Sequence, residues 1–322
     1  MKKGIKISLA VSVFLVLLGA VIFIIGMSVL GWDFKRLDAT EYTARSFAAG
    51  EDTSVTRVVI DVASFPVEVV KGDAVSLEYY DATNSEVTVE CADGVLTVRE
   101  KYDFNPFVTG FFNIGRMDRK YKLTIADGMD GVTLDGVNAN IEFDGITIGE
   151  LAVRTTNTDI SVISSNIGTF EVRSTNLTLC VKNSELGGMT VNGTNVGAEI
   201  ENVECPKMRI DATNLDFDAS GAHIDELSSD ATNNSTELRD SACTKLDITG
   251  TNGDYELYDV AVDTAAFRAT NLDAELRIVG IASEYTVITT GRNMPPQRIG
   301  STDKSITLSG TNNDVSLVFV ER

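Results

Sequence analysis

The sequence has little positive charge, one histidine and few cysteines, and these shortages narrow its possible functions. Its 27 Lys and Arg residues stand against 47 Asp and Glu, giving a formal net charge of −20. This balance argues against nucleic acid as a partner, because phosphate binding needs clustered basic residues. The only histidine, His223, belongs to no visible Ser-His-Asp arrangement. We therefore expect a protein that is not an enzyme and carries no cofactor.

One long apolar run lies near the N-terminus. Residues 7–30 are long enough, at ~1.5 Å per residue, to cross a ~30 Å hydrocarbon core. Basic residues dominate before the run and are diluted by aspartates after it: Lys2, Lys3 and Lys6, then Asp33, Lys35, Arg36 and Asp38. The positive-inside rule then places the N-terminus in the cytoplasm and the rest of the chain outside the cell membrane.

A cleaved signal peptide is the competing interpretation of this run. Its apolar region is typically ~7–15 residues and ends at small residues, and the run meets neither condition cleanly. We predict a cytoplasmic stub at 1–6, a transmembrane helix (a signal-anchor) at 7–30, a polar linker at 31–56 and an extracytoplasmic domain at 57–322.

Asparagine recurs at a constant step of nineteen residues, which is the strongest signal in the sequence. The series is Asn138, Asn157, Asn176, Asn195, Asn214, Asn233, Asn252 and Asn271, and from the second member onward each is preceded by Thr. A fixed period close to twenty is typical of stacked supersecondary units.

The pattern around each Asn indicates strands. Positions six and four before it are mostly large and apolar, such as Leu151 and Val153, and positions three and five after it are similar, such as Ile160 and Val162. This alternation has the period of two that strands show. A third apolar point follows ten residues after each Asn: Ile148, Ile167, Leu186, Cys205, Ile224, Cys243, Val262 and Ile281. Coils of this kind bury their apolar points only by stacking, so we predict an all-β parallel β-solenoid, or β-helix.

The repeat continues less regularly toward both ends. Ser64 takes the Asn place in an early coil, and Thr290-Gly291 and Thr311-Asn312 fit two final coils. Residues 101–120 interrupt the pattern with four phenylalanines. This aromatic insertion either caps the open end of the solenoid or forms an exposed patch for a partner or a membrane surface, and we favour the cap.

Over about residues 55–322 the chain resembles the bacterial membrane-anchored putative-adhesin domains of unknown function. The features that carry the resemblance are VVIDVASFPVEVV, YKLTIADGMDGVTLDGVNANIEF and the recurring Thr-Asn or Thr-Gly steps ending in YTVITTG and GTNNDVSLVFV. These domains are β-solenoids, often behind one transmembrane helix, and some are found near envelope-stress operons. The resemblance implies a surface or envelope role whose ligand is generally not known, and it brings no functional residues. The partners that we consider are an envelope protein and a glycan.

Two sets of polar residues are candidates for a site. The Asn series is expected to form a structural ladder at an inward-facing corner, each amide bonding the next. An acidic stripe on the outward side is a possible binding face, formed by Asp216, Asp218, Glu237, Asp254, Glu256, Asp273 and Glu275. Stacked like charges repel, and Arg239, Arg268 and Arg277 are candidates to relieve them.

The acidic stripe leaves alternatives open. Oxygen-rich clusters can hold Ca²⁺, but no Gly-rich calcium-binding repeat is present, so a solvated face is favoured over a metal site. Clustered carboxylates are also the working groups of some carbohydrate-active β-helix enzymes. The coils between 138 and 271 have no insertions to build a substrate cleft, so we favour an adhesion, scaffold or envelope-sensing surface.

The four cysteines are not expected to pair within the repeat. Cys205 and Cys243 occupy the same inward point two coils apart, hence ~9–10 Å between Cα atoms, beyond the ~7 Å limit for a disulfide. We predict free, buried thiols at both positions.

Overall fold

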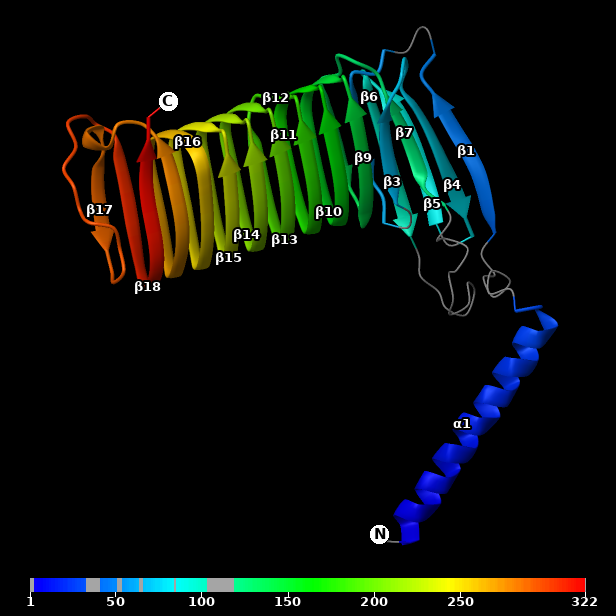
Figure 1. Ribbon diagram of the computed structural model, residues 1–322. Helices are drawn as coiled ribbons and strands as arrows, with labels where there is room; N and C mark the ends of the chain where they lie inside the picture. The colour runs from blue at the N-terminus through cyan, green and yellow to red at the C-terminus, as the bar shows by residue number, and fades with distance from the viewer. Residues whose placement is uncertain are drawn as a thin grey trace.

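Figure 1 shows the computed structural model of the chain, which describes residues 3–32, 41–50, 54–63, 66–83, 85–102 and 119–321. One helix, α1 (Lys3–Val29), begins four residues before the predicted span. Its segment Val11–Val29 has a mean hydropathy of 2.7 and is long and apolar enough to cross a membrane. A signal sequence would meet the same criteria.

The rest of the described chain is almost entirely strand. The strands before the regular repeat are β1 (Tyr42–Ala48), β2 (Arg57–Asp61), β3 (Val67–Lys71), β4 (Ser76–Ala82), β5 (Ser85–Ala92), β6 (Val95–Tyr102), β7 (Tyr121–Ile125), β8 (Gly131–Asp135) and β9 (Asn138–Asp144). Those of the repeat and the C-terminal end are β10 (Thr147–Ile163), β11 (Asn166–Lys182), β12 (Glu185–Leu186), β13 (Met189–Glu201), β14 (Glu204–Ser220), β15 (His223–Arg239), β16 (Ala242–Val279), β17 (Thr286–Thr290) and β18 (Ser305–Val320).

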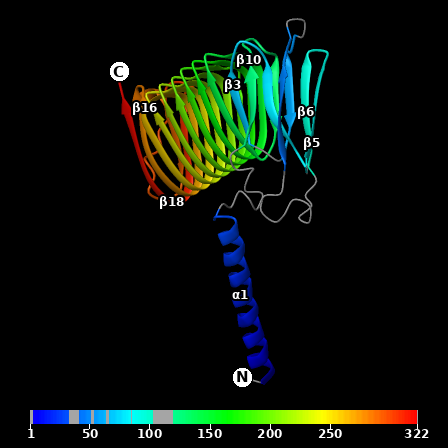
Figure 2. The same cartoon turned by 90° about the vertical axis from the view of Figure 1, so that its right-hand side faces the viewer.

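Strands β9 to β16 form the predicted parallel solenoid. Each coil stacks on the next in a register of nineteen residues, so that Asn157 lies beside Asn138 on one side and Asn176 on the other. Figure 2 shows these coils one behind another. The predicted inward positions are buried, among them Leu151, Val153, Ile160, Val162 and Ile167. Ile281 is the exception: it is exposed because the chain leaves the coil at Gly280.

The bends of the coil follow local backbone chemistry. Seven residues after each Asn from Asn138 to Asn252 the backbone takes a positive φ, at Gly145, Ser164, Asn183, Asn202, Gly221, Asp240 and Asp259. Glycine, asparagine and aspartate adopt this conformation at least cost, so the corner is encoded in residue type. At the next corner a Cβ added to Gly187 would stand 2.3 Å from the Gly168 carbonyl oxygen, so the backbone leaves no room for a side chain.

At the N-terminal end the coils do not follow chain order. β2 lies between β6 and β8, and β3 lies between β7 and β9, so an early coil is inserted between two later ones. Antiparallel pairings of β4 with β1 and β7, and of β5 with β6, then end the parallel stack. The segment predicted as a linker at 31–56 thus contributes a strand, β1. Ser64 and residues 103–118 of the aromatic insertion lie outside the described residues.

The C-terminal end is also out of order. β18 pairs with the last repeat of β16, placing Asn312 beside Asn271, and β17 pairs with the opposite edge of β18. The two final segments therefore stack on the repeat as predicted, but in the opposite order. The coil of Thr311-Asn312 comes first in space, and the strand that ends at Thr290 lies beyond it.

Candidate functional site

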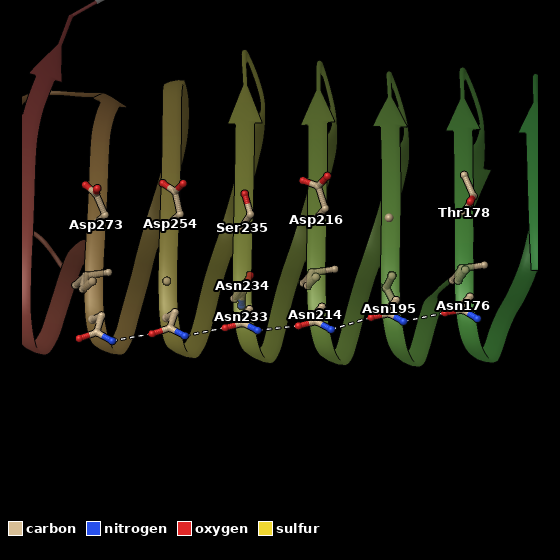
Figure 3. A pocket seen from close by; sticks show the side chains of 18 of the residues that line it. Asn176, Thr178, Asn195, Asn214, Asp216, Asn233, Asn234, Ser235, Asp254 and Asp273 are labelled. Carbon is tan, nitrogen blue, oxygen red and sulfur yellow. Dashed lines mark hydrogen bonds between the residues drawn. The ribbon is translucent and has the colours of Figure 1, made fainter. Parts of the chain in front are cut away.

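The asparagines form a continuous side-chain ladder along one corner of the solenoid (Figure 3). Each Nδ2 donates a hydrogen bond to the Oδ1 of the Asn one coil earlier, with N···O distances of 2.7 or 2.8 Å from Asn157 to Asn271. Asn312 continues the ladder by donating to Asn271 at 2.8 Å. The ladder therefore has one more rung than the period of nineteen reveals.

The ladder faces solvent, so the expectation of inward asparagines is wrong. From Asn157 onward every rung is exposed, as is the Thr before it. The chain bends at this Thr-Asn step and places two successive side chains outside. The next residue then points inward, as Leu177, Leu215 and Leu272 do, each at most 4% exposed.

A groove of about 1090 Å³ runs along the ladder. The exposed amides form one side, and the residues two positions further along each coil form the other. Figure 3 shows this second row, with Thr178, Asp216, Ser235, Asp254 and Asp273 parallel to the amides. The groove continues across coils from Asn138 to Asp314, and the chain between the rows forms its floor.

The predicted acidic face divides into two rows, and only one lines the groove. Asp216, Asp254 and Asp273 lie in it. The remaining members point outward two residues further on and are not part of the groove lining: Asp218, Glu237, Glu256 and Glu275. The carboxylates thus stand side by side along one sheet and do not face each other across a cleft.

Partial burial, together with neighbouring like charges, raises the pKa values of two carboxyl groups. Partial burial, with Asp273 and Glu256 nearby, raises the pKa of Asp254. The pKa of Asp218 is raised in the same way, by burial and then by Asp216 and Glu199. Both raised pKa values mean that ionisation of these two carboxyl groups is less favourable in the folded chain than in water.

Basic residues reduce the repulsion between carboxylates in only some parts of the acidic stripe. Arg239 pairs with Glu237, as expected, and its guanidinium lies 4.4 Å from the Tyr258 ring. Lys182, which was not predicted, bridges Glu199 and Glu201 with N···O distances of 2.6 and 3.1 Å.

The other two predicted bases lie elsewhere. Arg277 pairs with Asp259 and Arg268 pairs with Asp247, away from the two acidic rows. The groove carboxylates Asp254 and Asp273 keep no basic partner within 4 Å in the described part of the chain.

The groove is suited to recognition by hydrogen bonds. Each amide in the ladder uses one N–H and one oxygen lone pair, which leaves a second donor and a second acceptor toward solvent. The row of carboxylates adds acceptors. Among the described residues no three His, Cys, Asp or Glu side chains gather where they could hold a metal ion. His223 is exposed, 3.6 Å from Asp225, and lies outside the groove.

The repeat thiols are free. Cys205 and Cys243 are buried, as predicted, and neither forms a disulfide. Burial raises the pKa of Cys243 to about 12, so its thiol stays protonated at neutral pH. Cys180 is half-buried on the outward side, beside Ser161 of one neighbouring coil and Glu199 of the other.

Comparison with known proteins finds a family and two solved structures that are similar to this chain. No curated protein sequence matches it. Two solved structures are similar: a putative adhesin from Bacteroides fragilis, at 12% identity and a TM-score of 0.33 over 87% of this chain and 97% of that one, and a putative cell adhesion protein from Clostridium sporogenes, at 8% identity and a TM-score of 0.20 over 88% and 99%. The model of the Toastrack family, DUF4097, matches residues 55–257, well over half of the chain, and the chain therefore belongs to this family.

Proposed function

We propose that the protein is a membrane-anchored, non-enzymatic envelope protein that binds an extended polymer along the ladder groove, and so acts in adhesion, as a scaffold or in envelope sensing. The observation that carries the proposal is the continuity of the groove. The same three positions of each coil line it from Asn157 to Asp314, with Asn138 and Ala139 at its first end, and no loop is inserted between coils 138 and 271. A repeating site suits a repeating ligand.

The chemistry of the groove favours a ligand rich in hydrogen-bond donors. Amide and carboxylate oxygens accept from hydroxyl or ammonium groups. The net charge of −20 repels polyanions. A neutral or basic glycan fits these requirements, as does a basic extended segment of an envelope protein, and we propose the glycan as the primary ligand.

The anchor gives the proposed orientation. Helix α1 would cross the membrane once, with the lysines at its start in the cytoplasm and the solenoid outside. Protease added to protoplasts should then digest the solenoid. A solenoid that survives until the protoplasts are lysed would reverse the orientation.

Glycan binding can be tested by sedimentation of the full chain with insoluble cell-wall glycan. The variant Asp254→Asn with Asp273→Asn removes two charges from the groove. Its matched control, Glu256→Gln with Glu275→Gln, removes two charges from the same strands just outside the groove. We expect the groove variant to lose binding and the control to retain it.

Three results would contradict this scheme. Absence of binding by the wild-type chain would remove the glycan as ligand. Equal losses in the two variants would show that overall charge, not the groove, determines binding. Release of reducing ends from the glycan, abolished in the groove variant, would assign the carboxylates to hydrolysis.

A further inference from the structure

The last coil of the solenoid is covered along only half its length. β17 pairs with residues 305–309 of β18, whereas the rest of β18 pairs with β16 on one side only. In the part of the chain described without a break, 119–321, no strand pairs with the other edge of residues 311–320. Figure 2 shows this red strand at the outer edge of the stack. Such an edge presents backbone donors and acceptors that are free to pair.

The core is open at the same place. In the last repeat of β16, the inward side chains Leu276 and Ile278 are 1% and 0% exposed. The corresponding residues of β18, Leu317 and Phe319, are only partly buried although they pack against the same core. No further coil covers them in the described chain; the Tyr285 ring, whose centroid lies 5.0 Å from that of Phe319, and the Arg298 guanidinium, at 5.9 Å, cover only part of Phe319.

The edge is also depleted of charge. The outward residues of the preceding coil are Asp273, Glu275 and Arg277, and their neighbours in β18 are Asp314, Ser316 and Val318. Val318 is 54% exposed. In a chain with a net charge of −20, this edge is a place where two copies can approach with little repulsion.

We propose that this edge pairs with the same edge of a second copy, in antiparallel orientation about a two-fold axis. A two-fold contact uses one patch twice and closes on itself. In a register centred on Ser316, Val315 of one copy lies opposite the partner's Leu317, so apolar inward positions meet across the interface. Each open core would then be covered by the other.

The N-terminal edge is a poorer partner for β18. β1 carries Arg45, which is ion-paired with Asp81 at 3.0 Å. Tyr42, where β1 begins, follows the end of α1 by only 13 residues, so this end stays near the anchor. Pairing of β18 with β1 would also leave an edge free at each end and build open filaments.

The proposal can be tested by measuring the mass of the full chain in detergent by sedimentation velocity. The edge variant is Ser316→Lys with Val318→Lys, which places outward charges on the free edge without entering the core. The matched control is Ser161→Lys with Ile163→Lys, because these residues occupy the same two coil positions within the stack. We expect dimers of the 34.7 kDa chain for the wild type and the control. The edge variant should have a dimer dissociation constant raised roughly tenfold or more.

Hydrogen exchange supplies a second measurement. Backbone amides of residues 311–320 should exchange more slowly in the wild type than in the edge variant, while the circular dichroism of the two stays the same. A monomeric wild type, or one that forms larger open assemblies, would overturn the proposal. So would an edge variant that stays dimeric, because α1 is identical in all three chains and would then hold the dimer. A monomer that binds another envelope protein through this edge would replace the second copy with a different partner.

Discussion

The asparagine ladder makes a prediction about how stability is distributed along the solenoid. Asn195 donates one hydrogen bond to Asn176 at 2.8 Å and accepts another from Asn214 at 2.7 Å. Replacing it with Ala removes both. Each bond contributes about 0.5–1.5 kcal/mol net, so the free energy of unfolding should fall by about 1–3 kcal/mol. The amides left behind are exposed and can bond to water, which places the loss toward the lower end of this range.

A double-mutant cycle separates the ladder from other effects of the substitution. Asn195 and Asn214 share one bond, so the double Ala variant loses three bonds where the two single variants lose two each. The combined loss should therefore be smaller than the sum by about one bond, roughly 0.5–1.5 kcal/mol. Asn195 and Asn252 lie three coils apart, ~14 Å, and their effects should add.

Urea unfolding of the full chain in detergent, followed by the strand signal in circular dichroism, gives these free energies. The comparison of the two cycles is the decisive measurement, because loss of strand propensity is common to both. If the adjacent pair is as additive as the distant pair, the amide bonds contribute nothing and the reasoning is refuted.

Three further predictions follow from the same coils. Gly187→Ala should destabilise the chain by about 1–3 kcal/mol because its Cβ meets a backbone oxygen, whereas Gly188→Ala, whose nearest neighbour is 3.8 Å away, should be tolerated; thermal unfolding compares them. Asp254→Asn should stabilise the fold at pH 7. The raised carboxyl pKa means that the contribution of Asp254 to wild-type stability is greatest below pH ~4 and falls as pH rises through the folded-state value, so the advantage of the variant should disappear on acidification. A thiol reagent at pH 8 should label Cys180 in the folded chain and reach Cys243 only after unfolding, which mass spectrometry can follow.

The middle of the solenoid could be predicted because its contacts are local and periodic. A step of nineteen residues fixes the register of β10 to β16, and the alternation of apolar residues identifies most inward positions. The position directly after each Asn was missed. It is inward in every coil but varies from Leu177 to the buried Asn234, so its apolar pattern is interrupted. Asn234 instead bonds to Ser229 and Thr236 inside the core.

Two other features were missed for different reasons. The corner seven residues after each Asn was readable, because Gly, Asn and Asp recur there, but a pattern of hydrophobicity does not show it. The exposure of the ladder was not readable, since Asn at a bend can face either way. The strand order at the two ends of the solenoid could not be predicted. The pairings of β2 and β18 join segments that are far apart in the sequence, and the nineteen-residue period carries no information about them.

The order of the end coils has a consequence for how the chain folds. In the middle, each coil needs only the one before it, so folding can start there and spread. β2 and β3 must wait for strands as late as β8 and β9, and β18 has to enter between β16 and β17, which is made before it. As the chain is synthesised, the regular coils can therefore fold before the strands at the two ends have paired. The free edge, residues 311–320, can form only after β17 has been made and β18 has entered the stack.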